Sequence, residues 1–352
     1  MDASIALNRF GLGAAPDDRI EGSPRRWLLD QLERYSPRPP GIAALAPSTT
    51  IAAELADYLK QSRMERRMPA VAPDPTMRNA APATGAPIRK RGADARREAR
   101  REGRDHYVAA VQARAQVAID TPAPFAERLV HFWANHFAVS ADKLTTVGLA
   151  GAMEFEAIRP HLLGSFREML HAVERHPAML LYLDQAQSVG PGSPAGLATG
   201  NRARKLGLNE NLAREILELH TLGVRTGYRQ SDVTEFARAM TGWTVAGLGR
   251  GGSGRGRPVG SFAFVPRLHE PGARTVLGRS WNQPGEAQAA AVLDMLATHP
   301  ATARHIATKL ARHFGGDDPP APLVARLEKA FLASDGDLPS VYRALVEAPE
   351  CW

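Results

Sequence analysis

Residues 209–220 read NENLAREILELH, and their spacing predicts an amphipathic helix. Three apolar residues recur at helical intervals and form one seam of this helix: Leu212, Ile216 and Leu219. Asn209 is the expected N-cap, because a short polar side chain at that position accepts a hydrogen bond from the first turn. Glutamate, asparagine and arginine occupy the other faces. The stretch therefore indicates a helical fold in which this helix packs on one side only.

A second short helix is predicted directly after the first. Gly223 is the expected C-cap of the first helix, and the segment SDVTE from Ser231 opens the second as a capping segment does. The second helix is predicted to end at Thr241-Gly242-Trp243. A tight turn between the helices would bring four polar side chains together: Glu215, Glu218, Asp232 and Arg238. Carboxylates beside arginines tune acid–base groups, but structural ion-pair networks contain the same residues, so both interpretations stay open.

A polar stripe is predicted on an earlier helix, in which residues 127–137 read ERLVHFWANHF. Glu127, His131 and Asn135 lie four residues apart and therefore share one face of that helix. Bulky apolar side chains surround them, so the stripe is either a solvated face or a hydrogen-bonded buried network. His131 and His136 are five residues apart, which does not match the His-Glu-x-x-His zinc arrangement.

His269 precedes a Pro-Gly turn, and a loop histidine is a better functional candidate than a helical one. Other chemistry-bearing motifs are incomplete. Glu168-x-x-His171 has the spacing of a di-iron bundle but lacks a second copy, so we predict no metal site. The glycine-rich stretch 247–260 lacks the ending of a phosphate-binding loop, and no Gly-x-Ser-x-Gly nucleophile elbow occurs. The sequence does not identify a cofactor.

Composition limits the class of protein. The chain has 352 residues, 44% hydrophobic content, a net charge of +7 and one cysteine, Cys351, so an internal disulfide is impossible. No apolar run is long enough to span a bilayer. The basic run between Arg63 and Arg104 lacks interleaved aromatics that stack on bases, so nucleic-acid binding is not expected. The first residues do not form a signal peptide, so a cytoplasmic protein is expected as given, with export to the periplasm as the alternative if the N-terminus is incomplete.

The predicted architecture is mainly α: a multi-helix orthogonal bundle-like domain with long loops and one small β-hairpin within 260–278. One domain covers residues 1–352, with flexible loops at 68–92 and 246–258. Helices are predicted within 4–36 and at 50–66, 93–120, 122–138, 145–160, 164–173, 176–184, 209–222, 230–241, 285–298, 300–314, 320–333 and 337–347.

The sequence resembles a bacterial family, domain of unknown function 1800 (DUF1800). The segments that carry the resemblance are ALNRFG at 6–11, HFWANHF at 131–137, PAMLLYLD at 177–184, GLNENLARE at 207–215 through Gly223, residues 232–243, and His269 with Gly272 and Leu277-Gly278. The resemblance implies a largely helical domain but no established activity. It also implies frequent export, genes beside those for alkaline-phosphatase-like proteins, and chains that extend beyond Trp352, so this chain is expected to end before the last helices of the family.

Two hypotheses of function follow. In the first, an enzyme acts by acid–base chemistry on an anionic or polymeric substrate of the envelope, in a cleft between the His131 helix and the helix pair 209–243. Its predicted catalytic residues are Glu215, His131, His269 and Asp232. Its predicted substrate-binding residues are Asn209, Asn211, Arg214, Arg238, Trp243 and Asn135. In the second, a non-catalytic binding or assembly protein works with an alkaline-phosphatase-like partner, and the same polar residues hold two helices together.

Overall fold

The computed structural model describes residues 1–352 apart from 17, 68–85, 199–206, 250–253 and 255. Helices dominate the fold, and the sheets in the described ranges are two small antiparallel hairpins. The prediction of a mainly α protein is therefore confirmed. Most buried apolar side chains belong to one continuous cluster. Within these ranges no helix combines the length and the apolar character that crossing a membrane requires.

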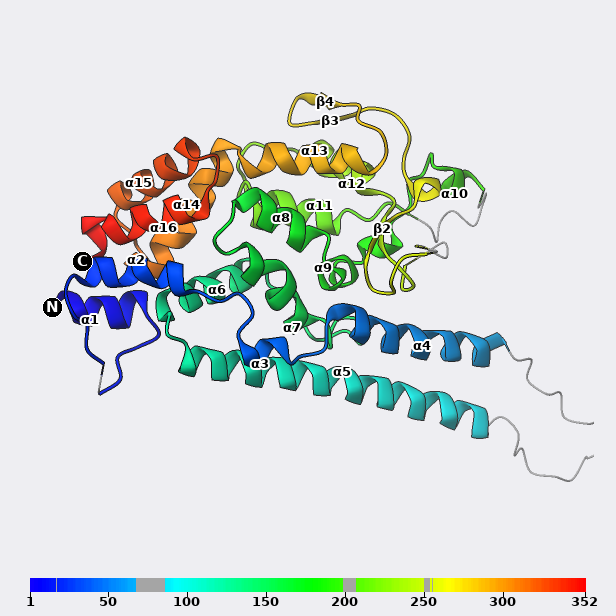
Figure 1. Ribbon diagram of the computed structural model, residues 1–352. Helices are drawn as coiled ribbons and strands as arrows, with labels where there is room; N and C mark the ends of the chain where they lie inside the picture. The colour runs from blue at the N-terminus through cyan, green and yellow to red at the C-terminus, as the bar shows by residue number, and fades with distance from the viewer. Residues whose placement is uncertain (17, 68–85, 199–206, 250–253, 255) are drawn as a thin grey trace, which may run out of the picture.

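The first and last parts of the chain pack together at one end of the molecule (Figure 1). This end contains α1 (Asp2–Ile5), η1 (Ala6–Phe10), α2 (Pro24–Arg34), α14 (Pro300–Gly315), α15 (Ala321–Ala333), α16 (Leu338–Glu347) and η9 (Pro349–Cys351). The Phe10 ring stacks on Phe314 and on Trp352, with centroids 5.7 and 5.2 Å apart. Because burying large aromatic rings contributes strongly to packing, these contacts hold the two chain ends together.

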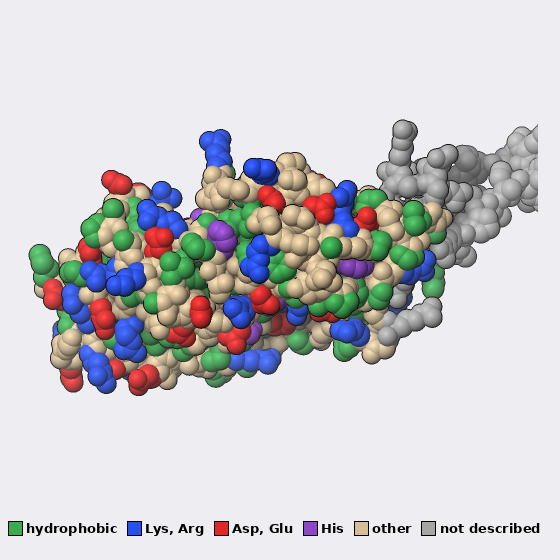
Figure 2. Space-filling model, turned by 90° about the horizontal axis from the view of Figure 1, so that it is seen from above, with side chains coloured by type: hydrophobic (Ala, Val, Ile, Leu, Met, Phe, Trp, Pro, Cys, Tyr) green, Lys and Arg blue, Asp and Glu red, His purple; other side chains and the backbone are tan. Residues whose placement is uncertain are grey.

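The central helices surround the core beside this end (Figure 1). They are α6 (Pro124–His136), η3 (Arg159–His161), α8 (Phe166–Glu174), α9 (Pro177–Tyr182), η4 (Gln185–Gln187), α11 (Asn211–Glu215), α12 (Gln230–Met240) and α13 (Glu286–Ala297). Two short helices, α10 (Pro194–Leu197) and η8 (Pro266–Leu268), pack on a separate small apolar cluster. The indole of Trp133 is fully buried and donates a hydrogen bond to the Tyr342 hydroxyl at 2.7 Å. This contact fixes α6 against α16. Figure 2 shows basic and acidic side chains interspersed over the face seen from above.

Two long helices, α4 (Ser48–Arg67) and α5 (Ala86–Asp120), form a hairpin that extends beyond the core, with α3 (Pro40–Ala43) packed on α5 (Figure 1). The loop predicted at 68–92 is therefore wrong for residues 86–92, which are helical, and its remainder falls on residues 68–85, outside the described part. Proline is tolerated in a first turn and the following residues favour helix, which explains why α5 begins this early. Residues 250–253 and 255 of the loop predicted at 246–258 also lie outside the described part, and its other residues are in neither helix nor strand.

The short helix α7 (Ala150–Met153) lies unusually close to α5. A Cβ atom at Gly151 would be 2.4 Å from the Cβ of Ala110, so only glycine permits this approach. The predicted helix 145–160 starts later, at Ala150, and changes type along its length: α7 continues into the π-helical η2 (Glu154–Ile158) and then into η3. This arrangement places the start of η2 beside α5 and α6.

Four short strands form two hairpins where one was predicted. Strand β1 (Trp243–Val245) pairs with β2 (Phe262–Phe264), and β3 (Arg274–Val276) pairs with β4 (Arg279–Trp281). Trp243 was predicted to end a helix but begins β1. Gly242 has φ +92°, which ends the helix before it, and the sequence Trp-Thr-Val favours extended backbone.

The predicted helix 209–222 is confirmed in place but not in type. It consists of α11 followed by a π-helical turn, η6 (Ile216–His220). Because π-helical turns are rare and occur frequently at functional sites, the residues of η2 and η6 are candidates for a functional site.

Candidate functional site

The predicted residues of α11 and α12 take part in a polar network that joins the two helices. The Arg214 guanidinium lies 3.2 Å from a carboxylate oxygen of Glu210 and donates to Gln230 at 3.0 Å. Glu210 also accepts from the Thr234 hydroxyl at 2.6 Å, and that hydrogen bond is the main reason why its pKa is lowered. Sequence reasoning did not single out Glu210, which contacts three side chains of the pair. The network can hold α11 against α12 without any ligand.

Asp232 accepts hydrogen bonds from two backbone amides. Its carboxylate oxygens lie 2.7 Å from the amide nitrogen of Arg229 and 2.8 Å from that of Leu277. It therefore caps α12 and fixes the turn between β3 and β4. Arg238 pairs with Glu235, which also receives the Arg274 guanidinium. Both predicted residues are engaged within the protein.

The asparagines at the start of α11 are also placed by the backbone. Asn209 donates from its side chain to the Leu183 carbonyl at 3.0 Å and accepts from the Asn211 amide at 2.9 Å, as expected of a capping residue. The Asn211 side chain is exposed. Glu215 is partly buried at the end of α11 and, among the residues described, makes no hydrogen bond or ion pair.

Trp243 and His269 are both engaged within the protein. The Trp243 side chain is 1% exposed, and the Arg175 guanidinium lies over its ring at 5.2 Å. His269 Nδ1 is 2.9 Å from the Thr241 carbonyl oxygen, which fixes the ring beside the end of α12. Burial lowers the pKa of His269. Binding of a substrate to the Trp243 ring would require the Arg175 side chain to move.

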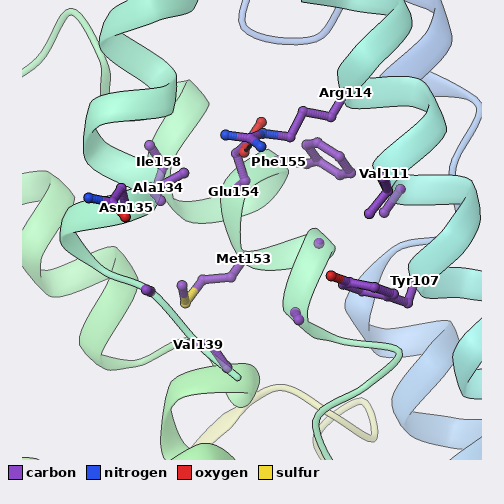
Figure 3. A pocket seen from close by; sticks show the side chains of 14 residues that line it. Tyr107, Val111, Arg114, Ala134, Asn135, Val139, Met153, Glu154, Phe155 and Ile158 are labelled. Carbon is purple, nitrogen blue, oxygen red and sulfur yellow. Dashed lines mark ion pairs between the residues drawn. The ribbon is translucent and has the colours of Figure 1, made fainter. Parts of the chain in front are cut away.

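A cavity of about 280 Å³ lies between α5, α6, α7 and η2 (Figure 3). Of the ten predicted residues, Asn135 alone lines it. Arg114 and Tyr107 face it from α5, and Glu154 faces it from the start of η2. Its volume lies just below the range of roughly 300 to 1,000 Å³ that is typical of ligand pockets, so only a small ligand fits it. Aromatic and aliphatic side chains beside the charged pair complete its lining.

The ion pair in this cavity joins an exposed and a buried group. Arg114 Nε lies 2.7 Å from one Glu154 carboxylate oxygen, while Arg159 Nε lies 3.2 Å from the other. The Arg114 side chain is 40% exposed, whereas that of Glu154 is 8% exposed. Burial raises the pKa of Glu154 despite the two arginines. A carboxyl group with a raised pKa in a solvent-reachable cavity is suited to accept or donate a proton.

Behind the cavity, Arg159 is completely buried and makes a bidentate contact with Glu127 of α6. Tyr35 donates to the Arg159 carbonyl at 3.2 Å, and burial is the main cause of its raised pKa. Glu127 in turn lines a second cavity, of about 340 Å³, with Tyr35. The charged network therefore runs through the protein from one cavity to the other.

His131 belongs to the same network. Its Nε2 is 3.7 Å from a Glu127 carboxylate oxygen, too far for a hydrogen bond, and is buried without a hydrogen-bond partner in the described part of the chain. Burial, followed by the charges of Arg114 and Arg159, lowers the pKa of His131 to about 4. The polar stripe Glu127, His131 and Asn135 is thus a buried network at one end and reaches the cavity at the other.

Acid is expected to destabilise the fold through His131. In the unfolded chain this ring titrates near 6.5, so below that pH the unfolded state binds more protons than the folded state. The free energy of unfolding is therefore not reduced by His131 above about pH 6.5. It decreases as the pH drops below that value, and the decrease due to His131 ends below about pH 4. We expect a loss of up to about 3 kcal/mol at pH 4. Urea unfolding between pH 7.5 and 4 checks this, and His131→Gln should lose less stability over the same range; equal losses in the two proteins would contradict it.

The described residues contain no group of three or more His, Cys, Asp or Glu side chains arranged to hold a metal ion. Glu168 caps α8 through Ser165, and His171 lies 2.9 Å from Asp294. Neither residue of the Glu-x-x-His spacing contacts the cavity.

Sequence reasoning missed three charged residues: Arg114 and Glu154, which line the cavity, and Arg159, which lies behind it. They lie on three separate elements, so no periodic pattern connects them. One local signal existed, since Glu154, Glu156 and Arg159 are charged residues that alternate with apolar ones in the helical stretch EFEAIR.

Comparison with known proteins adds one finding. The family model described as "Protein of unknown function (DUF1800)" matches residues 5–352. No curated protein and no solved structure matches the chain.

Proposed function

Since this chain belongs to the DUF1800 family, whose function is unknown, we propose an activity from the site: acid–base catalysis on a small anionic substrate, or on the anionic end of a polymer, bound in the Arg114–Glu154 cavity. The observation that carries the proposal is the contact between a solvent-reachable guanidinium and a buried carboxyl group inside a ligand-sized cavity (Figure 3). In this proposal the catalytic centre lies outside residues 209–243.

The charges support an anionic substrate. Arg114 is partly exposed, and a guanidinium binds carboxylate or phosphate in a bidentate manner. An incoming anion competes with Glu154 for this guanidinium. Glu154 then keeps Arg159 but loses Arg114, and its pKa rises further because the carboxyl group remains buried.

The proton released or taken up by Glu154 supplies the chemistry. Once protonated, its carboxyl group can donate to a leaving group of the bound substrate, and in the ionised state it can accept a proton from water. Asn135 faces the cavity from α6 and offers an amide that donates and accepts hydrogen bonds. Of the predicted substrate-binding residues, Asn135 is the one that we propose binds substrate in this cavity.

Glu154→Gln is expected to reduce turnover by about 10²- to 10⁴-fold, because it removes the proton while keeping the shape of the side chain. The assay is a screen of esters, phosphate esters and glycosides that carry an anionic group, restricted to substrates that the unmodified protein turns over. Glu215→Gln is the matched control and should retain full activity. Unchanged turnover in a folded Glu154→Gln protein would remove Glu154 from the reaction.

A specific observation favours the alternative, a binding or assembly protein. The residues of 209–243 pair mainly with one another and with the backbone, as a structural network does. An alkaline-phosphatase-like protein is the partner that the resemblance implies. Co-purification of such a partner at the same yield with the unmodified protein and with Glu154→Gln, together with no turnover in the screen, would favour this alternative.

A further inference from the structure

Lys309 is a partly buried lysine without an acidic partner in the described structure. It lies on α14, and its Nζ is 2.7 Å from Nδ1 of His136 on α6. No carboxylate of a described residue comes within ion-pair distance of it. A buried ammonium is normally paired, so an amine that meets a histidine instead is unusual. Lys143 offers the contrast, because its Nζ lies 2.9 Å from an Asp184 carboxylate oxygen.

The contacts of His136 determine which of its nitrogens can accept a proton. Its Nε2 is 3.1 Å from the His220 carbonyl oxygen, and since a carbonyl only accepts, Nε2 must carry the hydrogen. Nδ1 is therefore the acceptor that faces the Lys309 amine. Burial, and then the charge of Lys309, lower the pKa of His136 well below its ordinary value, so the ring is neutral.

The other groups around the amine leave its charge unbalanced. The Nδ1 of His220, on η6, lies 2.8 Å from the buried Glu174 carboxylate on α8, so this carboxylate pairs with His220 and not with Lys309. His305, one turn before Lys309 on α14, directs Nε2 to the Leu219 carbonyl oxygen at 3.1 Å. The group in contact with the amine is thus the His136 imidazole, and the rings of His220 and His305 lie beside His136. Burial lowers the pKa of Lys309 to about 8.

We propose that Lys309 is a nucleophilic amine that forms a Schiff base with an aldehyde or ketone, with His136 as its base. The geometry of the cluster points to this role, because a neutral amine held by an imidazole acceptor is prepared for attack on a carbonyl carbon. The inference is independent of the Arg114–Glu154 cavity, to which Lys309 contributes no atom.

The step balances without a cofactor. The nitrogen lone pair forms the N–C bond while the carbonyl π electrons move to oxygen. One N–H proton passes to Nδ1 of His136 and then to that oxygen, which gives a neutral carbinolamine. Loss of water leaves the imine. Because Lys309 is only partly buried, a small carbonyl compound is the class of ligand that fits this proposal.

The test is reductive labelling with butanal and cyanoborohydride, followed by mass-spectrometric peptide mapping. The chain has six lysines, which makes the mapping unambiguous. At pH 7.5 a pKa of about 8 leaves roughly 200-fold more neutral amine than the ordinary value near 10.4. Lower basicity reduces nucleophilicity, so we expect Lys309 to be labelled at least about tenfold faster than Lys143 and the exposed Lys329.

The pH profile and two variants complete the test. Labelling of Lys309 should rise through a single ionisation near pH 8. His136→Asn keeps an acceptor near the Nδ1 position but no base, and should slow labelling; Lys309→Met should abolish this one adduct. If Lys309 in the unmodified folded protein reacts no faster than Lys329, the proposal is wrong, whatever the variants do.

Discussion

Replacing Arg159 by methionine is expected to lower the free energy of unfolding by about 3 to 5 kcal/mol, the usual result of leaving a buried ion without its partner. Arg159 is fully buried and lies between the carboxylates of Glu127 and Glu154. Without it, two buried carboxylates remain, and Glu127 keeps only the distant His131 ring, 3.7 Å away. Urea unfolding followed by circular dichroism measures the loss.

The control for this prediction removes the whole triad. Glu127→Leu and Glu154→Leu added to Arg159→Met leave no buried charge, while Arg114 stays solvated through its exposed side. Because apolar residues of similar volume often replace a buried ion cluster at little cost, the triple variant should recover most of the lost stability. A triple variant less stable than Arg159→Met would show that packing around Arg159, rather than charge, is the source of the effect.

The helix that contains Glu127 shows what sequence can and cannot predict. Spacing alone placed Glu127, His131 and Asn135 on one face; His131 lies beside the buried Glu127, and Asn135 lines the cavity. Spacing could not show whether this face is exposed to solvent or buried, because that depends on residues from other elements. Arg114 and Arg159 reach this face from α5 and η3, and no local rule relates positions brought together by tertiary packing.

The pair of helices at 209–243 shows a different limit. The positions of the two helices were predicted closely. Glu215 was expected to contact polar residues of α12, but the residue that accepts hydrogen bonds from α12 is Glu210. A π-helical turn begins directly after Glu215, so the faces of the following residues are not those of an α-helix. Such a turn depends on packing rather than on residue propensity. The prediction that a helix ends at Trp243 was wrong for a similar reason, because Gly242 has a positive φ and Trp243 begins a strand.

Asp232→Ala is expected to lower the free energy of unfolding by about 2 to 3 kcal/mol, since two backbone amides lose their acceptor. Asp232 is 8% exposed and holds the amides of Arg229 and Leu277. The loss therefore affects both the start of α12 and the β3–β4 turn. Thermal and urea unfolding of the variant, compared with the unmodified protein, provide the measurement.

Glu215→Gln is the matched comparison, because Glu215 lies on the facing helix and has no partner among the described residues. We expect its stability to remain within about 0.5 kcal/mol of the unmodified protein. The two variants show whether Asp232 positions the backbone or takes part in catalysis. If Asp232→Ala is as stable as Glu215→Gln yet lacks the activity found in the substrate screen, then Asp232 acts in the reaction. If it is destabilised and the folded fraction retains full turnover per molecule, its carboxylate positions backbone and the reaction takes place elsewhere.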